Sequence, residues 1–188
     1  MHVPRSAASL HRSRDARLAA YRGFGLRHGW SVLGLHEDLS SRYPVAPVFG
    51  ARSAQAELAL AGRWEGWDGL IASVLVLPRV EGRAPRHASA DLVVQFTVLD
   101  TGPDARQFIA SWTLTGPSIV PTNGAAAESL PSLETVLGRA GSDALRPGDR
   151  VAATEMELVH ARTILPRQRV VDLEGPLHVL GLVASSLR

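Results

Sequence analysis

Histidine and carboxylate side chains gather in one short stretch of the chain, where they could bind a divalent metal or transfer protons. His28, His36, Glu37 and Asp38 fall within eleven residues, and imidazole and carboxylate groups serve both metal ligation and acid–base catalysis. The two histidines, however, lie eight residues apart across a Gly-Trp turn, which matches neither a helical nor a strand-type ligand pair. We therefore predict no metal or other cofactor, and keep these four residues as the candidates for a His/carboxylate metal-dependent hydrolase.

A second histidine–carboxylate pattern, Glu-x-Glu-x-x-His, comprises Glu155, Glu157 and His160. On a helix, Glu157 and His160 would share a face, as in one half of a di-iron carboxylate site. On a strand, the two glutamates would face one side and His160 the other, because side chains alternate. The second half of the di-iron pattern does not occur in the chain. We therefore interpret these three residues as part of the fold.

Two missing residue types exclude several classes of enzyme. All 20 basic residues are arginine and there is no cysteine. The chain therefore has no amine for a Schiff base or a P-loop, and no thiol for catalysis, disulfides or metal binding. A G-x-S-x-G nucleophile motif does not occur either, and the stretch from Gly23 to Gly29 has one residue too many for a dinucleotide-binding loop. We predict no catalytic residue, and the sequence favours a protein that is not an enzyme.

Positive charge is concentrated near the N-terminus. Residues 1–30 contain six arginines and one acid, Asp15, for a net charge of +5, whereas the remaining residues carry −3. A basic arm on a mildly acidic body is typical of proteins that bind nucleic acid, an anionic membrane surface or an acidic partner. A solvated helix face gives the same pattern and is the alternative interpretation. The candidate binding residues in this segment are Arg5, Arg12, Arg14, Arg17, Arg22 and Arg27.

Two tryptophans, Trp64 and Trp67, flank a predicted hairpin turn and lie beside Arg63. Exposed tryptophans next to arginine could stack on nucleic-acid bases or anchor a protein partner. Packing in the core is the alternative, because the chain has only four Trp, two Tyr and four Phe with which to fill it. Both tryptophans are therefore kept as candidate binding residues.

The hydrophobic pattern predicts the elements that must hold these residues. Apolar runs bounded by turn residues predict strands, with a tight turn at Glu65 and Gly66. Ser13 is a candidate cap for an N-terminal helix that ends at Gly29, and leucines at alternating spacings of four and three predict a closing helix. The predicted strands are residues 30–35, 56–64, 69–77, 91–99 and 107–114, with one or two more in 151–165. The other predicted elements are helices over 13–27, 130–139 and 173–187, a long loop over 116–131 and a turn at 146–149.

Together these elements predict a single α+β domain. Its antiparallel sheet has about four to six strands in a meander, because no helical pattern separates the successive strands, and it packs against the N- and C-terminal helices. The hydrophobic fraction of 45% is sufficient for a buried core. We expect residues 1–11 to be a disordered leader and residues 12–188 to form the domain.

Several short motifs resemble those of an uncharacterised actinobacterial soluble α+β domain that is often found in membrane-anchored proteins. The motifs, in order, are Gly29-Trp30, Arg42-Tyr43 with Pro47 and Phe49, the hairpin Gly62-Arg63-Trp64-Glu65-Gly66, and the closing segment Asp172-Leu173-Glu174-Gly175-Pro176-Leu177. The similarity covers roughly residues 16–115 and the last twenty residues. It implies an α+β fold, and it carries no catalytic residue to this chain.

The sequence therefore favours a non-catalytic interaction or scaffolding module, which binds a protein partner or a second copy of itself. A nucleic-acid- or anionic-surface-binding protein that uses the N-terminal arginines is the alternative, and a metal-dependent hydrolase is the second. No apolar run is long enough to span a membrane, and the N-terminus lacks the apolar core of a secretory signal. We expect a bacterial, cytoplasmic protein, since arginine replaces lysine throughout, as in high-GC genomes.

Overall fold

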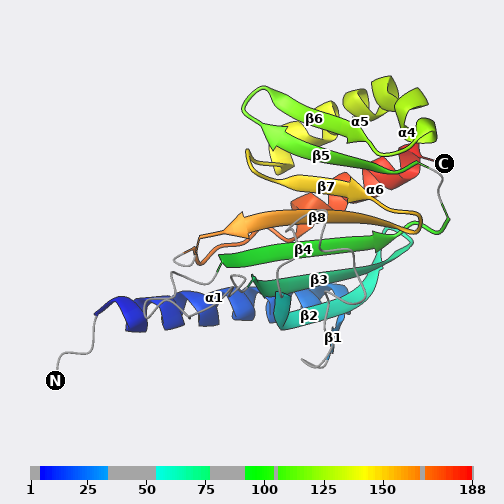
Figure 1. Cartoon of the computed structure of the whole chain (residues 1–188). Coiled ribbons are helices and arrows are strands. Elements are labelled where there is room, and N and C mark those ends of the chain that lie inside the picture. The colour runs from blue at the N-terminus through cyan, green and yellow to red at the C-terminus, as the bar shows by residue number, and fades with distance from the viewer. Residues whose placement is uncertain (1–4, 34–53, 77–91, 104–105, 166–167, 188) are drawn as a thin grey trace, which may run out of the picture.

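The computed structural model describes residues 5–33, 54–76, 92–103, 106–165 and 168–187, which form one eight-stranded antiparallel sheet with helices packed against it (Figure 1). The helices are α1 (Arg5–His28), α4 (Gly124–Glu128), α5 (Leu130–Ala144) and α6 (Glu174–Ser186). The strands are β1 (Ser31–Leu33), β2 (Ala54–Trp64), β3 (Trp67–Val76), β4 (Leu92–Asp100), β5 (Phe108–Thr113), β6 (Gly116–Pro121), β7 (Arg150–Ala153) and β8 (Glu157–Ile164). The predicted α+β class is confirmed, and the predicted number of strands was too low.

The order of the strands is β1-β2-β3-β4-β8-β7-β5-β6, and every neighbouring pair is antiparallel. The first four strands follow the predicted meander. The fifth strand, β5, departs from the meander, because it does not pair with β4. Strands β8 and β7 lie between β4 and β5 in the sheet. Residues 101–107 connect β4 to β5, and their extended length is enough to cross two strands. The C-terminal strands therefore lie at the centre of the sheet.

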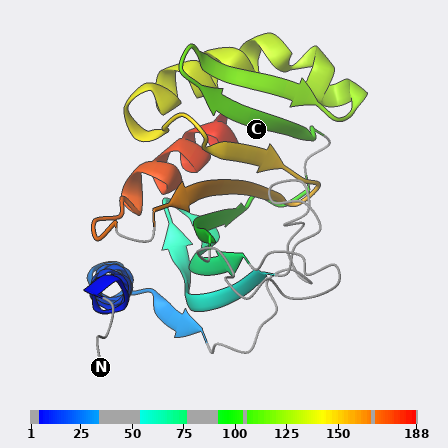
Figure 2. The ribbon, with the colours of Figure 1, turned by 60° about the vertical axis from the view of Figure 1, so that its left-hand side comes forward.

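Helices α1, α5 and α6 cover one face of the sheet (Figure 2). On α1, Leu18, Tyr21 and Gly25 are all buried, as their helical spacing predicts. The helix ends at His28, and Gly29 follows with φ +68, a left-handed conformation that suits glycine at this position. The N-terminal end differs from the prediction: α1 begins at Arg5 and includes residues 5–11, so Ser13 lies inside the helix and does not cap it.

The closing helix α6 agrees with its predicted pattern. The apolar residues that predicted it are buried against the sheet: Leu173, Leu177, Leu180, Ala184 and Leu187. The two-residue hairpin between β2 and β3 is also confirmed. Its central residues Glu65 and Gly66 have φ values of 49 and 93, which is the type I′ geometry that matches the twist of the strands.

The stretch 116–131, predicted as a long loop, instead contains β6, α4 and the first two residues of α5. Pro117 and Pro121 argued against a strand there. Because β6 is at the edge of the sheet, however, a proline can direct its missing amide outward, where no ladder hydrogen bond is needed. The predicted segment 151–165 forms two strands, β7 and β8, and the turn at 146–149 is closed by a hydrogen bond from Asp149 N to Arg146 O (2.9 Å).

The opposite face of the sheet carries a second apolar cluster, to which no described helix contributes. Its central members are Leu70, Val94, Phe96, Val98 and Val159, all buried. Because side chains alternate along a strand, β3, β4 and β8 bury side chains on both faces, as expected for central strands, but the helix-covered face also includes buried polar residues such as Gln95 and His160. We call this second side the helix-free face. Within the residues that the structure describes, no helix is long and apolar enough to cross a membrane.

Candidate ligand groove on the helix-free face

Two adjoining depressions open on the helix-free face at one end of the sheet. One, of about 500 Å³, is lined by residues of β1, β2, β3, β4 and β8, and the other, of about 550 Å³, by residues around β5, β7 and β8. Glu157 lines both. Together the two depressions cross most of the width of the sheet, and we call them the groove.

The floor of the groove is made of small and apolar side chains. Leu33, Leu70 and Val98 line one depression, and Ile109 and Val159 line the other. The small side chains of Ala61 and Ala152 lie between them, and Gly62, Gly69 and Ala153 also line the depressions. Such a floor suits the apolar part of a ligand, since binding removes it from water.

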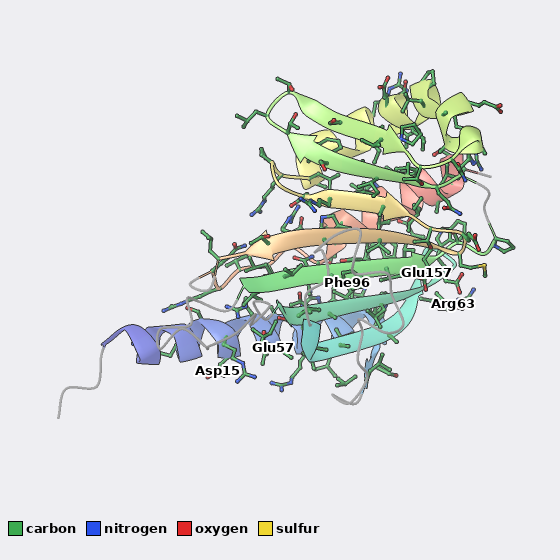
Figure 3. The ribbon with its side chains drawn as sticks, viewed as in Figure 1. Asp15, Glu57, Arg63, Phe96 and Glu157 are labelled. Atoms are coloured by element: carbon green, nitrogen blue, oxygen red, sulfur yellow. The ribbon has the colours of Figure 1, made fainter. Side chains whose placement is uncertain are left out.

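Charged residues from four neighbouring strands form one row along the groove. The register pairs Arg63 with Asp68, Asp68 with Asp100, and Asp100 with Glu157. Successive members are therefore separated by about 5 Å, the spacing of strands in a sheet. Figure 3 shows Arg63 and Glu157 at this same end of the sheet. The row has three carboxylates and one guanidinium, so its net charge is −2.

Local turn chemistry explains why the row forms. The two-residue turn at Glu65 and Gly66 places Arg63 opposite Asp68, and Arg63 Nε lies 3.4 Å from Asp68 Oδ1. Asp100 ends β4, where its Oδ1 accepts a hydrogen bond from Gly102 N (2.9 Å). Glu157 begins β8 and donates its backbone N–H to Thr154 Oγ1 (3.1 Å). Each carboxylate thus lies at a strand end, fixed by a turn.

Within the described part of the chain, no group of three or more His, Cys, Asp or Glu side chains lies close enough together to hold a metal ion. Parallel carboxylates on neighbouring strands repel each other. A cationic group placed above them would relieve this repulsion. The geometry therefore suits a ligand with positive charge and an apolar part.

A second polar cluster lies under the helices, on the other face. Asp149 accepts hydrogen bonds from Arg162 Nη2 (2.6 Å) and Arg162 Nε (3.0 Å), and its Oδ2 lies 3.3 Å from His160 Nε2. Burial alone would raise the pKa of Asp149, but the hydrogen bonds from His160 and Arg162 outweigh it and hold that pKa at about 2. Burial also lowers the pKa of His160 below its ordinary value, despite the neighbouring carboxylate.

This cluster resembles a catalytic arrangement, because Thr97 lies directly opposite His160 in the register and completes an Asp–His–hydroxyl series. Thr97 and His160 are both 0% exposed, however, and Asp149 is 2% exposed. A substrate would have to displace α6 to reach them, since α6 packs over β4 and β8. The cluster is therefore structural. His160 and Glu157 lie on opposite faces of β8, as the strand interpretation of Glu-x-Glu-x-x-His predicts.

The predicted N-terminal arginines do not form one exposed surface. Arg17 is 2% exposed and lies 3.9 Å from Glu57 Oε2, and Arg14 Nε donates to Glu57 Oε1 (2.7 Å). Ser73 Oγ donates to the same carboxylate (2.8 Å), so β2 and β3 together anchor α1. Figure 3 shows Glu57 at the place where the sheet meets this helix.

The remaining N-terminal arginines lie along α1. Arg27 is exposed, 3.9 Å from Glu174 of α6. Arg12 and Arg22 are also exposed, and Arg5 is the first residue of the helix. Tyr21, on the inner side of the same helix, donates to Ala72 O, and burial raises its pKa well above the ordinary value.

The two candidate tryptophans pack inward. Trp67 is 7% exposed and belongs to the core under α1. Trp64 is partly buried against the same core, with its ring stacked 6.1 Å from that of Phe24. The Trp67 ring is therefore packed in the core, and the Trp64 ring is partly covered.

The histidine–carboxylate candidates are mostly outside the described part of the chain. His28 lies at the end of α1, where its Nε2 is 3.2 Å from Glu174 Oε1. His36, Glu37 and Asp38 fall outside the described residues. The metal-dependent hydrolase therefore stays a prediction.

Sequence reasoning missed the groove residues Asp68, Asp100 and Glu157. Asp68 and Asp100 stand beside the ends of predicted strands, which was the available signal for them. Glu157 falls within the segment 151–165, predicted as one or two strands, and was interpreted as part of the fold. Their alignment depends on β8 lying beside β4, and no local pattern showed that pairing. In comparisons with known proteins, no family model, no curated protein and no solved structure matches the chain. The resemblance to the actinobacterial domain therefore stays a prediction.

Proposed function

We propose that the protein is a non-catalytic binding module that takes a basic, partly apolar peptide segment of a protein partner on its helix-free face. The observation that carries the proposal is the groove, where a row of carboxylates runs beside an apolar floor. Peptide recognition commonly combines apolar pockets with a few charged groups that set specificity.

Charge complementarity selects the class of ligand. The row of Arg63, Asp68, Asp100 and Glu157 has a net charge of −2, and its one guanidinium is already close to Asp68. Arginine or lysine side chains of a partner would therefore meet carboxylates, whereas an acidic partner would be repelled. The groove adjoins several strands, so an extended segment suits it better than a compact ligand.

The experiment uses a fluorescein-labelled ten-residue peptide in which leucine and arginine alternate, titrated with the full chain and followed by fluorescence anisotropy. We expect binding that the double variant Asp68→Asn/Glu157→Gln weakens about tenfold, which corresponds to about 1.4 kcal/mol. A matched control, Glu128→Gln/Glu134→Gln, makes the same change in charge on exposed positions of α4 and α5 and should bind as the wild type does. Equal affinities for the double variant and its control would contradict the proposal.

The nucleic-acid alternative receives less support from the contacts of α1. Arg14 and Arg17 share the carboxylate of Glu57, and Arg27 lies near Glu174, so these charges are partly compensated within the chain. A labelled 20-base-pair DNA duplex tests the alternative directly. Tight, salt-sensitive binding that Arg12→Gln/Arg22→Gln abolishes would favour it over the peptide-binding groove.

A further inference from the structure

Three buried polar atoms on the helix-covered face have no hydrogen-bond partner among the described residues. They are Gln95 Oε1, Thr97 Oγ1 and His160 Nδ1, and all three side chains are 0% exposed. An unsatisfied polar atom in the interior destabilises the fold, so three neighbouring ones need an explanation.

The register brings these three residues together. Thr97 of β4 lies directly opposite His160 of β8, where the Cβ atoms of such a pair are about 5 Å apart. Gln95 is two residues before Thr97 on the same strand, so it shares the face and lies about 7 Å away, within reach of its longer side chain. Phe96, between them, belongs to the apolar cluster of the helix-free face.

The hydrogen-bonding character of each atom follows from its other contacts. Asp149 is ionised at neutral pH and can only accept, so the proton of neutral His160 lies on Nε2 and Nδ1 presents a lone pair. Gln95 Nε2 donates to Asp172 O (2.7 Å), which identifies its Oε1 as a carbonyl acceptor. Thr97 can donate through its hydroxyl. The set therefore comprises two acceptors and one donor.

We infer that these side chains bind one internal water molecule, which bridges β4 and β8 beneath α6. A water molecule has two O–H donors for Gln95 Oε1 and His160 Nδ1, and it accepts from the Thr97 hydroxyl. A cation at this site would be repelled by the guanidinium of Arg162, which lies on the same face of β8. An anion would be repelled by the lone pairs of the two acceptors, Gln95 Oε1 and His160 Nδ1. A neutral ligand with two donors matches the site, and buried waters commonly make about three hydrogen bonds.

The first test is Thr97→Val, which removes the hydroxyl without changing the shape of the side chain. If the hydroxyl holds the water, its loss lowers the melting temperature by about 3 °C, the shift expected for one hydrogen bond in a domain of this size. If the hydroxyl is merely an isolated buried group, its replacement by a methyl raises the melting temperature instead. Thr163→Val, at an exposed position of the same sheet, is the control for strand propensity.

The second test reads the histidine directly. In ¹⁵N NMR spectra of the labelled full chain, His160 should carry its proton on Nε2, and Thr97→Val should shift the Nδ1 resonance while Thr163→Val does not. A crystal structure of the full chain should show water density within hydrogen-bond distance of all three atoms. A proton on Nδ1, or three ordered side chains with no density between them, would overturn the inference.

Discussion

We expect the negative charge of Asp149 to stabilise the folded protein, because it compensates a buried arginine. The variant Asp149→Asn tests this without changing the shape of the side chain. Asp149 is 2% exposed and faces the side chain of Arg162, which is 5% exposed. The variant keeps an oxygen acceptor but removes the negative charge. Among the described residues, Ala144 O would still accept a hydrogen bond from the guanidinium and Asp172 would lie 4.0 Å away, so the buried positive charge would be only partly compensated.

The expected loss follows from the buried pair. Removing one partner of a buried ion pair commonly destabilises a protein by about 3–5 kcal/mol, because the other charge stays buried. The pKa of Asp149 in the wild-type protein gives an independent value for the stability that its charge contributes. The pKa of Asp149 falls from 3.8 to about 2 on folding, which corresponds to about 2 kcal/mol of stability. This stability is present above about pH 4 and is lost as the pH falls toward 2, since the folded pKa is the lower one.

Urea unfolding at pH 7, followed by circular dichroism, measures the stability lost in Asp149→Asn. The same urea titration, repeated between pH 5 and pH 2, measures how much stability is lost on acidification. Asp149→Asn should lose about 3 kcal/mol at pH 7 and show a smaller acid-induced loss than the wild type. Asp68→Asn, whose side chain is 76% exposed, is the matched control and should change stability by less than about 0.5 kcal/mol. A loss below about 1 kcal/mol for Asp149→Asn would refute the reasoning.

Three further changes test other contacts. Glu57→Gln removes the carboxylate that anchors α1, and should cost about 2 kcal/mol in urea unfolding; a stability equal to wild type would show that α1 docks without it. Gly62→Ala places a Cβ against the Trp30 ring, and should lower stability by about 2 kcal/mol and shift the tryptophan fluorescence. The pKa of His160 is lowered by burial, so the unfolded chain takes up a proton that the folded chain does not. Stability should therefore decrease as the pH falls below about 6.5, with a shallower slope in His160→Leu, both read from melting temperatures.

The strands could be predicted from local pattern, but their order could not. Alternation and turn residues predicted β2, β3, β4 and β5 to within a few residues, because each strand satisfies its own periodicity. Pairing depends instead on which apolar surfaces match across long separations in the chain. The position of β8 beside β4 is such a case, and it determines both the charged row of the groove and the contact between Thr97 and His160.

Edge position explains the largest error in the element prediction. Pro117 and Pro121 exclude a central strand, and the sequence does not show that β6 lies at an edge, where proline is tolerated. The same limit applies to the polar residues of the helix-covered face. Gln95 and Thr97 occur in a run that predicts a strand, yet only the structure shows that helix α6 covers them.

The charge asymmetry of the chain has a different meaning once the fold is known. The net charge of +5 on residues 1–30 suggests a surface for an external anion, but the rest of the fold already supplies carboxylates to it. Glu57 of β2 contacts both Arg14 and Arg17, and Glu174 of α6 lies near Arg27. Part of the charge separation along the chain therefore serves to dock α1 onto the rest of the fold. The groove, whose carboxylates are brought into one row by the sheet, is the surface that we propose presents charge to a partner.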